Sequence, residues 1–230
     1  MKQLYRYVVK KCDHVTVVGR SLFDHVRSYG RKRPTDIIIN GVDQALFHPM
    51  DKSVCRKALN IPGDGVVIGT VGALYENRGI ANLFQAFFLL QQKIDHLFLV
   101  LAGPRDIPLP TEEAVRDLGI VDQDKVPEIL NALDIAVICN ADNPFGRYCF
   151  PAKAMEIMGC DIPLVASDVG SMGDFFKTHP HWLYKHDDPA DLAKKIAARL
   201  NDRQTGYTNI SWDDLGEVFL TIIGRLAGPK

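Results

Sequence analysis

Residues 66–103 read VVIGTVGALYENRGIANLFQAFFLLQQKIDHLFLVLAG, and this stretch shows the clearest structural pattern of the chain. Val66–Val71 and Leu97–Leu101 are continuous apolar runs of strand length. Between them, Gly79–Gln92 carries apolar residues close to a helical period. Apolar runs that alternate with a helix are typical of parallel strands buried on both faces. The stretch therefore predicts a strand–helix–strand unit with a right-handed crossover.

The same alternation continues on both sides of this unit. Further strands are expected at His14–Val18, Asp36–Ile39, around Gly119–Val121, and at Ile135–Ile138, Pro163–Ala166 and Trp182–Tyr184. Further helices are expected at Ser21–Tyr29, Lys125–Ala132, Ala152–Gly159, Pro189–Leu200 and Trp212–Leu226, with a long loop over Cys139–Phe150. We therefore expect an α/β fold, a Rossmann-like doubly wound parallel sheet with helices on both faces, at least from Phe47 to Leu200.

Composition narrows the class of protein. Hydrophobic residues make up 47% of the chain and charged residues 24%, which is typical of a soluble globular protein. The net charge of -1 excludes the overall basic excess of most nucleic-acid binders. The five cysteines and seven histidines show neither CxxC spacing nor a ligand-like pattern, so we expect no metal site.

The chain also lacks the marks of a membrane-spanning or exported protein. It contains no apolar run of transmembrane length and no signal-peptide core near Met1, so we expect a cytoplasmic protein. The basic run Arg31–Arg33 has two interpretations. It is either a solvated loop or a contact with anionic lipid, which would place the protein peripherally at the inner membrane face.

In a parallel sheet, ligands bind at the carboxyl ends of the strands. Gly72 follows one strand, and Arg78 precedes the next helix. This arrangement suits a phosphate, although a solvent-exposed arginine is the alternative. Gly103 follows the neighbouring strand and allows a ligand to approach the backbone, or simply makes a turn.

A third loop leads into a helix that carries one carboxylate among apolar residues. Glu156 lies between Ala154, Met155 and Ile157, and a carboxylate in such a helix needs a partner. A sugar diol is one candidate partner. An ion pair with Lys153, three residues earlier, is the other.

Six segments, in this order, resemble the GT-B family of retaining, nucleotide-sugar-dependent glycosyltransferases (family 4-like, group 1). They are IIINGVDQALFHP (37–49), GTVGALYENRGIANLFQAF (69–87), LVLAGP (99–104), DLGIVDQDKVPEILNALDIAVI (117–138), EIMGCDIPLVASDVGSM (156–172) and SWDDLGEVFLTII (211–223). The first is similar to the family's interdomain hinge. The resemblance therefore implies that residues 1–45 are the remnant of an N-terminal domain with the hinge, and that residues 46–230 are the C-terminal nucleotide-sugar-binding domain.

The resemblance also implies an activity in carbohydrate biosynthesis. A hexosyltransferase of this kind moves a sugar from a UDP- or GDP-sugar to an acceptor that the sequence does not identify, with no cofactor or metal. It needs an N-terminal domain, so this chain alone is either inactive or incomplete, and it either self-associates or pairs with the missing domain. The alternative is a non-catalytic nucleotide-sugar-binding or interaction module derived from a glycosyltransferase.

Individual residues take roles from the same resemblance. Arg78 stands where a cation neutralises the donor diphosphate, beside Gly72 and Gly103, and Glu156 stands where a carboxylate holds the ribose hydroxyls. The residues implied in the remaining contacts are Ile120 and Val121, against the base, and Phe150, Pro151, Ala152 and Lys153, facing the sugar and phosphate. Arg78, Lys153 and Glu156 are the implied catalytic group.

The sequence departs from the family pattern at three places. Ala73 replaces an arginine after the first glycine, Tyr148 replaces the first glutamate of a pair that ends at Glu156, and Pro151 replaces a glycine. The segment PAKAME resembles a variant of the motif found in some branches of the family.

Overall fold

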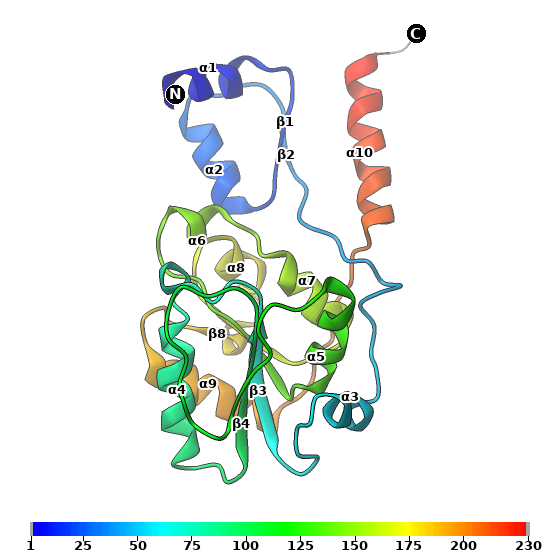
Figure 1. Cartoon of the computed structure of the whole chain (residues 1–230). Helices are drawn as coiled ribbons and strands as arrows, with labels where there is room; N and C mark the ends of the chain where they lie inside the picture. Colours follow the sequence, from blue (N-terminus) through cyan, green and yellow to red (C-terminus); the bar gives the residue numbers. More distant parts are fainter. Residues whose placement is uncertain (1, 229–230) are drawn as a thin grey trace.

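The computed structural model describes residues 2–228 and contains a six-stranded, fully parallel sheet with the order β5-β4-β3-β6-β7-β8 (Figure 1). Its strands are β3 Val66–Val71, β4 Leu97–Ala102, β5 Val115–Asp117, β6 Ile135–Ile138, β7 Leu164–Ser167 and β8 Leu183–Tyr184. Because the chain builds β4 and β5 on one side of β3 and then crosses to β6 on the other, the strand order reverses between β3 and β6. The expected α/β class is confirmed.

Helices cover both faces of this sheet, and each face has its own apolar core. The helices are α3 Lys52–Ala58, α4 Ala81–Gln91, α5 Val126–Ala132, α6 Pro144–Tyr148, α7 Ala152–Gly159, α8 Gly170–Phe175 and α9 Pro189–Asn201, with short 3-10 turns η1 Glu76–Arg78, η2 Gln123–Lys125 and η3 Pro180–Trp182. One core contains residues of α3, α5 and α7, and the other contains residues of α4 and α9. The sheet is therefore doubly wound, as predicted.

A smaller unit lies above the sheet. It consists of α1 Lys2–Lys11, β1 Val15–Val17, α2 Arg20–Ser28 and β2 Thr35–Ile37, and β1 and β2 form a two-stranded parallel sheet. The last helix, α10 Trp212–Ala227, rises beside it (Figure 1). We call α1 through β2 the N-terminal unit. Its assignment as the remnant of a further domain, and self-association through it, stay predictions.

The N-terminal unit is held partly by a buried arginine. Arg31 is 2% exposed and donates hydrogen bonds to the carbonyl oxygens of Val9 (2.6 Å), Cys12 (2.8 Å) and Pro34 (2.6 Å). The guanidinium group offers five donors, and backbone carbonyls together with the hydroxyl of Thr35 accept them without a counter-ion. The interpretation of a solvated or lipid-binding loop is therefore wrong for Arg31, whereas the neighbouring Lys32 is exposed.

Two elements differ from the expected ones. The edge strand β5 ends at Asp117, before the expected strand at Gly119–Val121, because Gly119 adopts a left-handed φ of 65° and its carbonyl oxygen accepts from the amide of Gly103 at 2.7 Å. The expected loop over Cys139–Phe150 contains α6. The side chain of Asn143 accepts from the amide of Gly146 and caps this short helix.

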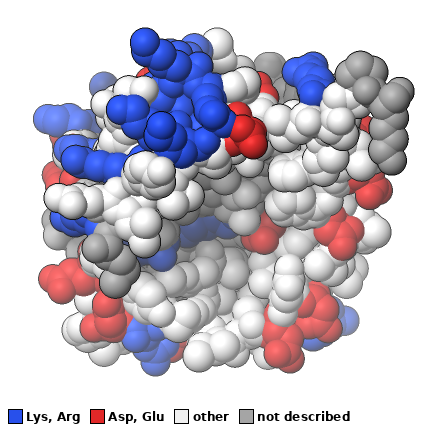
Figure 2. All heavy atoms as spheres, turned by 90° about the horizontal axis from the view of Figure 1, so that it is seen from above, with Lys and Arg blue, Asp and Glu red and all other residues white. Residues whose placement is uncertain are grey.

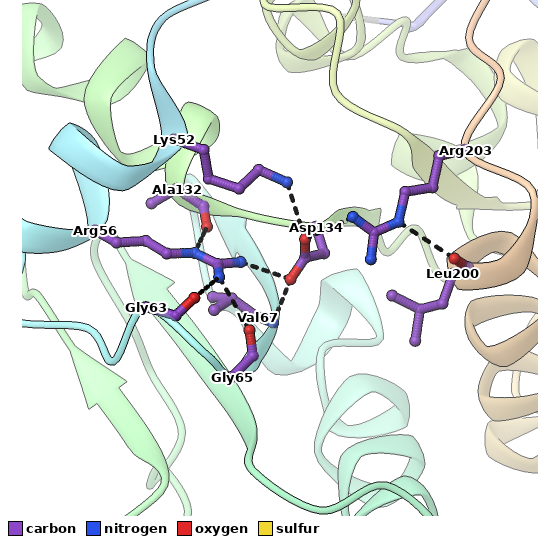
Figure 3. A network of polar contacts seen from close by, with 9 residues as sticks. All are labelled: Lys52, Arg56, Gly63, Gly65, Val67, Ala132, Asp134, Leu200 and Arg203. Carbon is purple, nitrogen blue, oxygen red and sulfur yellow. Dashed lines mark hydrogen bonds and ion pairs between the residues drawn. The ribbon is translucent and has the colours of Figure 1, made fainter.

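A buried ionic network lies at the amino-terminal ends of the central strands β3 and β6 (Figure 3). Asp134, directly before β6, is 4% exposed. Its carboxylate accepts from Arg56 (2.6 Å), Lys52 (2.9 Å), Arg203 (3.1 Å) and the amide of Val67 (2.8 Å). The network thus joins α3, β3, β6 and the segment after α9.

Candidate functional site

Glycines leave the backbone bare where neighbouring strands end. Gly72 follows β3 with φ 121°, and Gly103 follows β4 with φ 131°. A Cβ atom on Gly103 would lie 2.0 Å from the carbonyl oxygen of Gly72, so only glycine fits there. The carboxyl ends of β3 and β4 therefore form a floor on which no side chain blocks an approaching ligand.

Lys153 points to this floor from α7. The helix begins at Ala152, after Pro151, so Lys153 lies in its first turn. A Cβ atom built on Gly72 would lie 3.7 Å from the Nζ atom of Lys153. Burial lowers the pKa of Lys153, and the positive charge of Arg78 lowers it further, whereas Glu156 acts in the opposite direction. A second cation therefore lies within electrostatic reach of this ammonium group.

Arg78 is held by a ring from α6. Its guanidinium carbon lies 3.7 Å from the ring centre of Phe145, which is a close cation–π contact. The side-chain amide of Asn143 also donates to the carbonyl oxygen of Asn77 at 2.8 Å, which ties the loop before Arg78 to the start of α6. The arginine is therefore positioned on the site rather than free in solvent, and it is half-buried.

Glu156 follows Lys153 along the same helix and is half-buried. Burial raises the pKa of Glu156, and the charge of Lys153 partly offsets this effect. Across residues 2–228 no ion pair within 4.0 Å joins the two side chains, so the salt bridge considered from the sequence does not form. Glu156 retains a carboxylate that is open to a hydrogen-bond donor.

The other expected residues contribute unequally. Phe150 is 3% exposed and packs edge-to-face on Phe175, so its side chain belongs to the core and only its backbone can face a ligand. Ala152 is exposed at the start of α7, and Pro151 is buried. Ile120 is 80% exposed beyond β5, and Val121 packs against the core. The structure therefore brings Arg78, Lys153 and the two glycines together, whereas the side chains of Phe150 and Val121 lie in the core.

One group of side chains near the site was not anticipated. Tyr148, on α6, bonds through its hydroxyl to the Nδ1 atom of His25 at 3.1 Å, and the two rings stack 4.4 Å apart. This contact joins α6 to α2 of the N-terminal unit, 123 residues away in sequence. The replacement of a family glutamate by Tyr148 was the one signal in the sequence.

Residues 2–228 contain neither a metal-binding group of side chains nor a membrane-spanning helix. Between residues 2 and 228 no group of three or more His, Cys, Asp or Glu side chains is arranged to hold a metal ion. Over the same residues, no helix combines the length and the apolar character needed to cross a membrane.

Comparison with known sequences identifies similar proteins. Residues 65–202 match the family described as glycosyl transferases group 1. D-inositol 3-phosphate glycosyltransferase 2 of Catenulispora acidiphila is 29% identical over 196 residues, which cover 76% of this chain and 45% of the relative. The putative teichuronic acid biosynthesis glycosyltransferase TuaC of Bacillus subtilis is 30% identical over 166 residues, which cover 72% and 40%. The chain spans about half the length of these curated relatives, or less.

Solved structures show the same arrangement of elements. Sucrose-phosphate synthase from Thermosynechococcus elongatus superposes with a TM-score of 0.79 at 22% identity, over 97% of this chain and 61% of that chain. Anabaena Alr3699/HepE in complex with UDP superposes with a TM-score of 0.81 at 19% identity, over 96% and 66%. The likeness of fold therefore includes the N-terminal unit as well as the large sheet.

Proposed function

The chain belongs to the glycosyl transferases group 1 family, and from this premise we propose that it carries the donor site of a retaining glycosyltransferase that uses a UDP- or GDP-linked sugar. The family is one of transferases, which favours catalysis over a binding module. The similar fold of HepE, solved with UDP, supports a nucleotide diphosphate as the ligand class. The relatives are longer than this chain, so the proposal names the donor class and leaves the acceptor unspecified.

The approach of Lys153 to Gly72 is the observation that carries the proposal. The ammonium group lies against the bare end of β3, and Arg78 is fixed beside it by Phe145. Two cations beside exposed glycine backbone suit a diphosphate. The glycines leave room for the diphosphate, and the cations neutralise its negative charge. The first-turn amides of α7, whose N-cap residue Pro151 offers no side-chain acceptor, provide further donors.

The same groups act on the transfer step. The bond between the anomeric carbon and the diphosphate oxygen breaks, and the electron pair stays on the leaving diphosphate. Lys153 and Arg78 stabilise the negative charge that develops there. The acceptor oxygen bonds to the anomeric carbon on the face that the leaving group vacates, so the configuration is retained, and its proton leaves with the diphosphate. This step needs no metal ion.

Glu156 has the role of anchoring the nucleoside. Its carboxylate is half-buried and lies on the same helix as Lys153, so it can accept hydrogen bonds from the two ribose hydroxyls next to a diphosphate bound at Lys153. The base then lies near the turn from Gly119 to Val121, which follows the neighbouring edge strand. Burial of the carboxylate strengthens such charge-assisted bonds.

Titration calorimetry tests the site without an acceptor. We expect UDP or GDP to bind the wild-type chain. ADP is titrated as a third nucleotide for comparison. Glu156→Gln should weaken binding by roughly tenfold or more, because a hydrogen bond to a charged group contributes about 1.5–3 kcal/mol. Arg78→Ala should also weaken binding and should make it less dependent on salt.

Lys93→Ala is the matched control, because Lys93 is an exposed cation just after α4, close to the amino end of β4. It should bind as tightly as the wild type. If none of the three nucleotides binds, or if Glu156→Gln binds as well as the wild type, the donor site is assigned wrongly.

A further inference from the structure

A cavity of about 560 Å³ lies between the N-terminal unit and α6. Its lining includes Tyr148 and Pro144 of α6, which are one helical turn apart. Phe145, on a different face of the same short helix, holds Arg78. The cavity therefore shares a wall with the proposed diphosphate site without being part of it, and its volume is within the usual range for small-molecule sites.

Aromatic rings in a fixed arrangement form much of its wall. His25 bonds to Tyr148 through Nδ1 at 3.1 Å and to Tyr29 through Nε2 at 2.7 Å. A neutral imidazole donates to one of these hydroxyl oxygens and accepts from the other hydroxyl. Whichever tautomer is present, the tyrosine that accepts from His25 keeps its own hydroxyl hydrogen for another partner. The wall therefore combines flat ring faces with a hydroxyl donor that a ligand can use.

The charge of the lining is entirely positive. Lys2 and Arg6 contribute to the cavity from α1, and no acidic residue lines it. The guanidinium carbon of Arg6 lies 5.0 Å from the ring centre of Tyr29, so this cation is placed over the ring wall. Seen from above, lysine and arginine side chains gather on the side of the molecule where α1 lies (Figure 2). Such a surface attracts anions to the cavity.

We propose that this cavity binds a negatively charged, hydroxyl-rich group, namely a phosphate or carboxylate carried on a sugar or polyol. The inference rests on the proposed function, because a transferase brings such a group next to its donor diphosphate. Lys2 and Arg6 neutralise the anion, the tyrosine hydroxyl bonds to it or to a neighbouring hydroxyl, and the ring faces pack on the apolar face of the sugar. The group belongs either to the acceptor or to the sugar of the donor.

Paired ligands that differ by one anionic group test this proposal by titration calorimetry on the whole chain. Glucose 6-phosphate against glucose represents the acceptor side. UDP-glucuronate against UDP-glucose represents the donor side. We expect the charged member of at least one pair to bind roughly tenfold more tightly than its neutral counterpart, as a charge-assisted bond allows.

Variants locate the preference in the cavity. Arg6→Gln with Lys2→Gln should remove most of the preference for the charged ligand, and Tyr148→Phe should weaken it while leaving the ring wall in place. Lys11→Gln is the control, because Lys11 is an exposed cation of the same helix that does not line the cavity. Loss in the glucose 6-phosphate pair assigns the anion to the acceptor, and loss in the UDP-glucuronate pair assigns it to the donor sugar.

The inference is overturned if neither charged ligand binds better than its neutral counterpart, or if Lys11→Gln loses as much preference as the cavity variants. UDP alone is titrated in parallel with the same variants, and its affinity should not change. Absence of UDP binding contradicts the donor site, whereas the glucose 6-phosphate pair still reports on the cavity, so the two failures are distinguishable.

Discussion

Replacing Asp134 by asparagine should destabilise the chain more than breaking a surface ion pair. The carboxylate is the shared acceptor for Arg56, Lys52 and the amide of Val67 (Figure 3). An asparagine can still accept two of the four hydrogen bonds in this network through its oxygen, but its amide nitrogen turns a donor toward the other two donors, at least one of which is a cation. The side chain of Arg56 is 7% exposed, so water cannot replace the lost partner.

The magnitude follows from this burial. Removing one partner of a buried pair costs about 3–5 kcal/mol of unfolding free energy. Arg56 also donates to the carbonyl oxygens of Ala132, Gly63 and Gly65, so it remains hydrogen-bonded, and the lower end of this range is expected. At roughly 2–4 °C per kcal/mol for a chain of this size, the melting temperature should fall by about 6–12 °C.

Urea denaturation at pH 7 and a thermal scan measure the effect. Asp117→Asn is the control, because Asp117 pairs with Arg105 at the surface, where both side chains are at least one-third exposed, and it should cost less than about 1 kcal/mol. If Asp134→Asn costs no more than this control, the network does not stabilise the sheet and the reasoning is refuted.

The pH dependence of the same pair of proteins gives a second check. Burial alone would raise the pKa of Asp134, but hydrogen bonds from Lys52 and Val67 and the charges of Lys52 and Arg56 hold it below its ordinary value of 3.8. A folded pKa below the unfolded one stabilises the fold above the unfolded value, and this stabilisation is lost as the pH falls through the folded one. The difference between wild type and Asp134→Asn should therefore be complete at pH 7 and shrink below about pH 4.

Three further outcomes are expected. Gly103→Ala should lower both stability and UDP affinity, because its Cβ atom meets the carbonyl oxygen of Gly72 at 2.0 Å and its φ of 131° strains an alanine; thermal scans and calorimetry measure the two effects. UDP affinity should decline as the pH rises, and the decline should begin below pH 10.5, the ordinary pKa of lysine, because burial lowers the pKa of Lys153 and only its charged form attracts the diphosphate. Calorimetry between neutral and alkaline pH measures this decline, and a flat profile contradicts it. Ser211→Ala removes the hydrogen bond that the Ser211 hydroxyl accepts from the amide of Asp214, one of the two bonds of the capping box at the start of α10, and should cost about 1 kcal/mol in urea denaturation; Ser28→Ala, which lies outside this box, should cost less.

The large sheet was predictable because its central strands are continuous apolar runs. Val66–Val71 and Ile135–Ile138 have no polar side chain except Thr70, so both faces of these strands need to be covered, as they are at the centre of a sheet with helices on both sides. The edge strand β5 has the sequence VRD, which is too short and too polar to show a period, and it forms because β4 offers it a backbone partner. Pattern alone therefore fixes central strands better than edge strands.

The site was predictable only where local sequence decides it. Glycines at strand ends and a cation before a helix are local signals, and Gly72, Gly103 and Arg78 carry them. The contact of Arg78 with Phe145 and the bond of Tyr148 to His25 join segments 67 and 123 residues apart. The burial of Arg31 is a similar case, because it accompanies hydrogen bonds to the carbonyl oxygens of Val9 and Cys12, about twenty residues earlier, which an Arg-Lys-Arg run does not indicate.

Two adjacent lengths of chain leave the large sheet, one leading to the N-terminal unit and one leading to α10. Val42 forms a parallel bridge with Ser211, its amide donates to the carbonyl oxygen of Ile210 at 3.0 Å, and a Cβ atom on Gly41 would lie 2.9 Å from the amide nitrogen of Trp212. Twisting one length against the other would break this bridge, whereas folding both together would keep it. The bridge therefore holds the two lengths of chain side by side where they leave the large sheet. Any displacement of the N-terminal unit from the large sheet would also have to part α2 from α6 and α8, where His25 bonds to Tyr148 and the hydroxyl of Ser21 donates to Asp174.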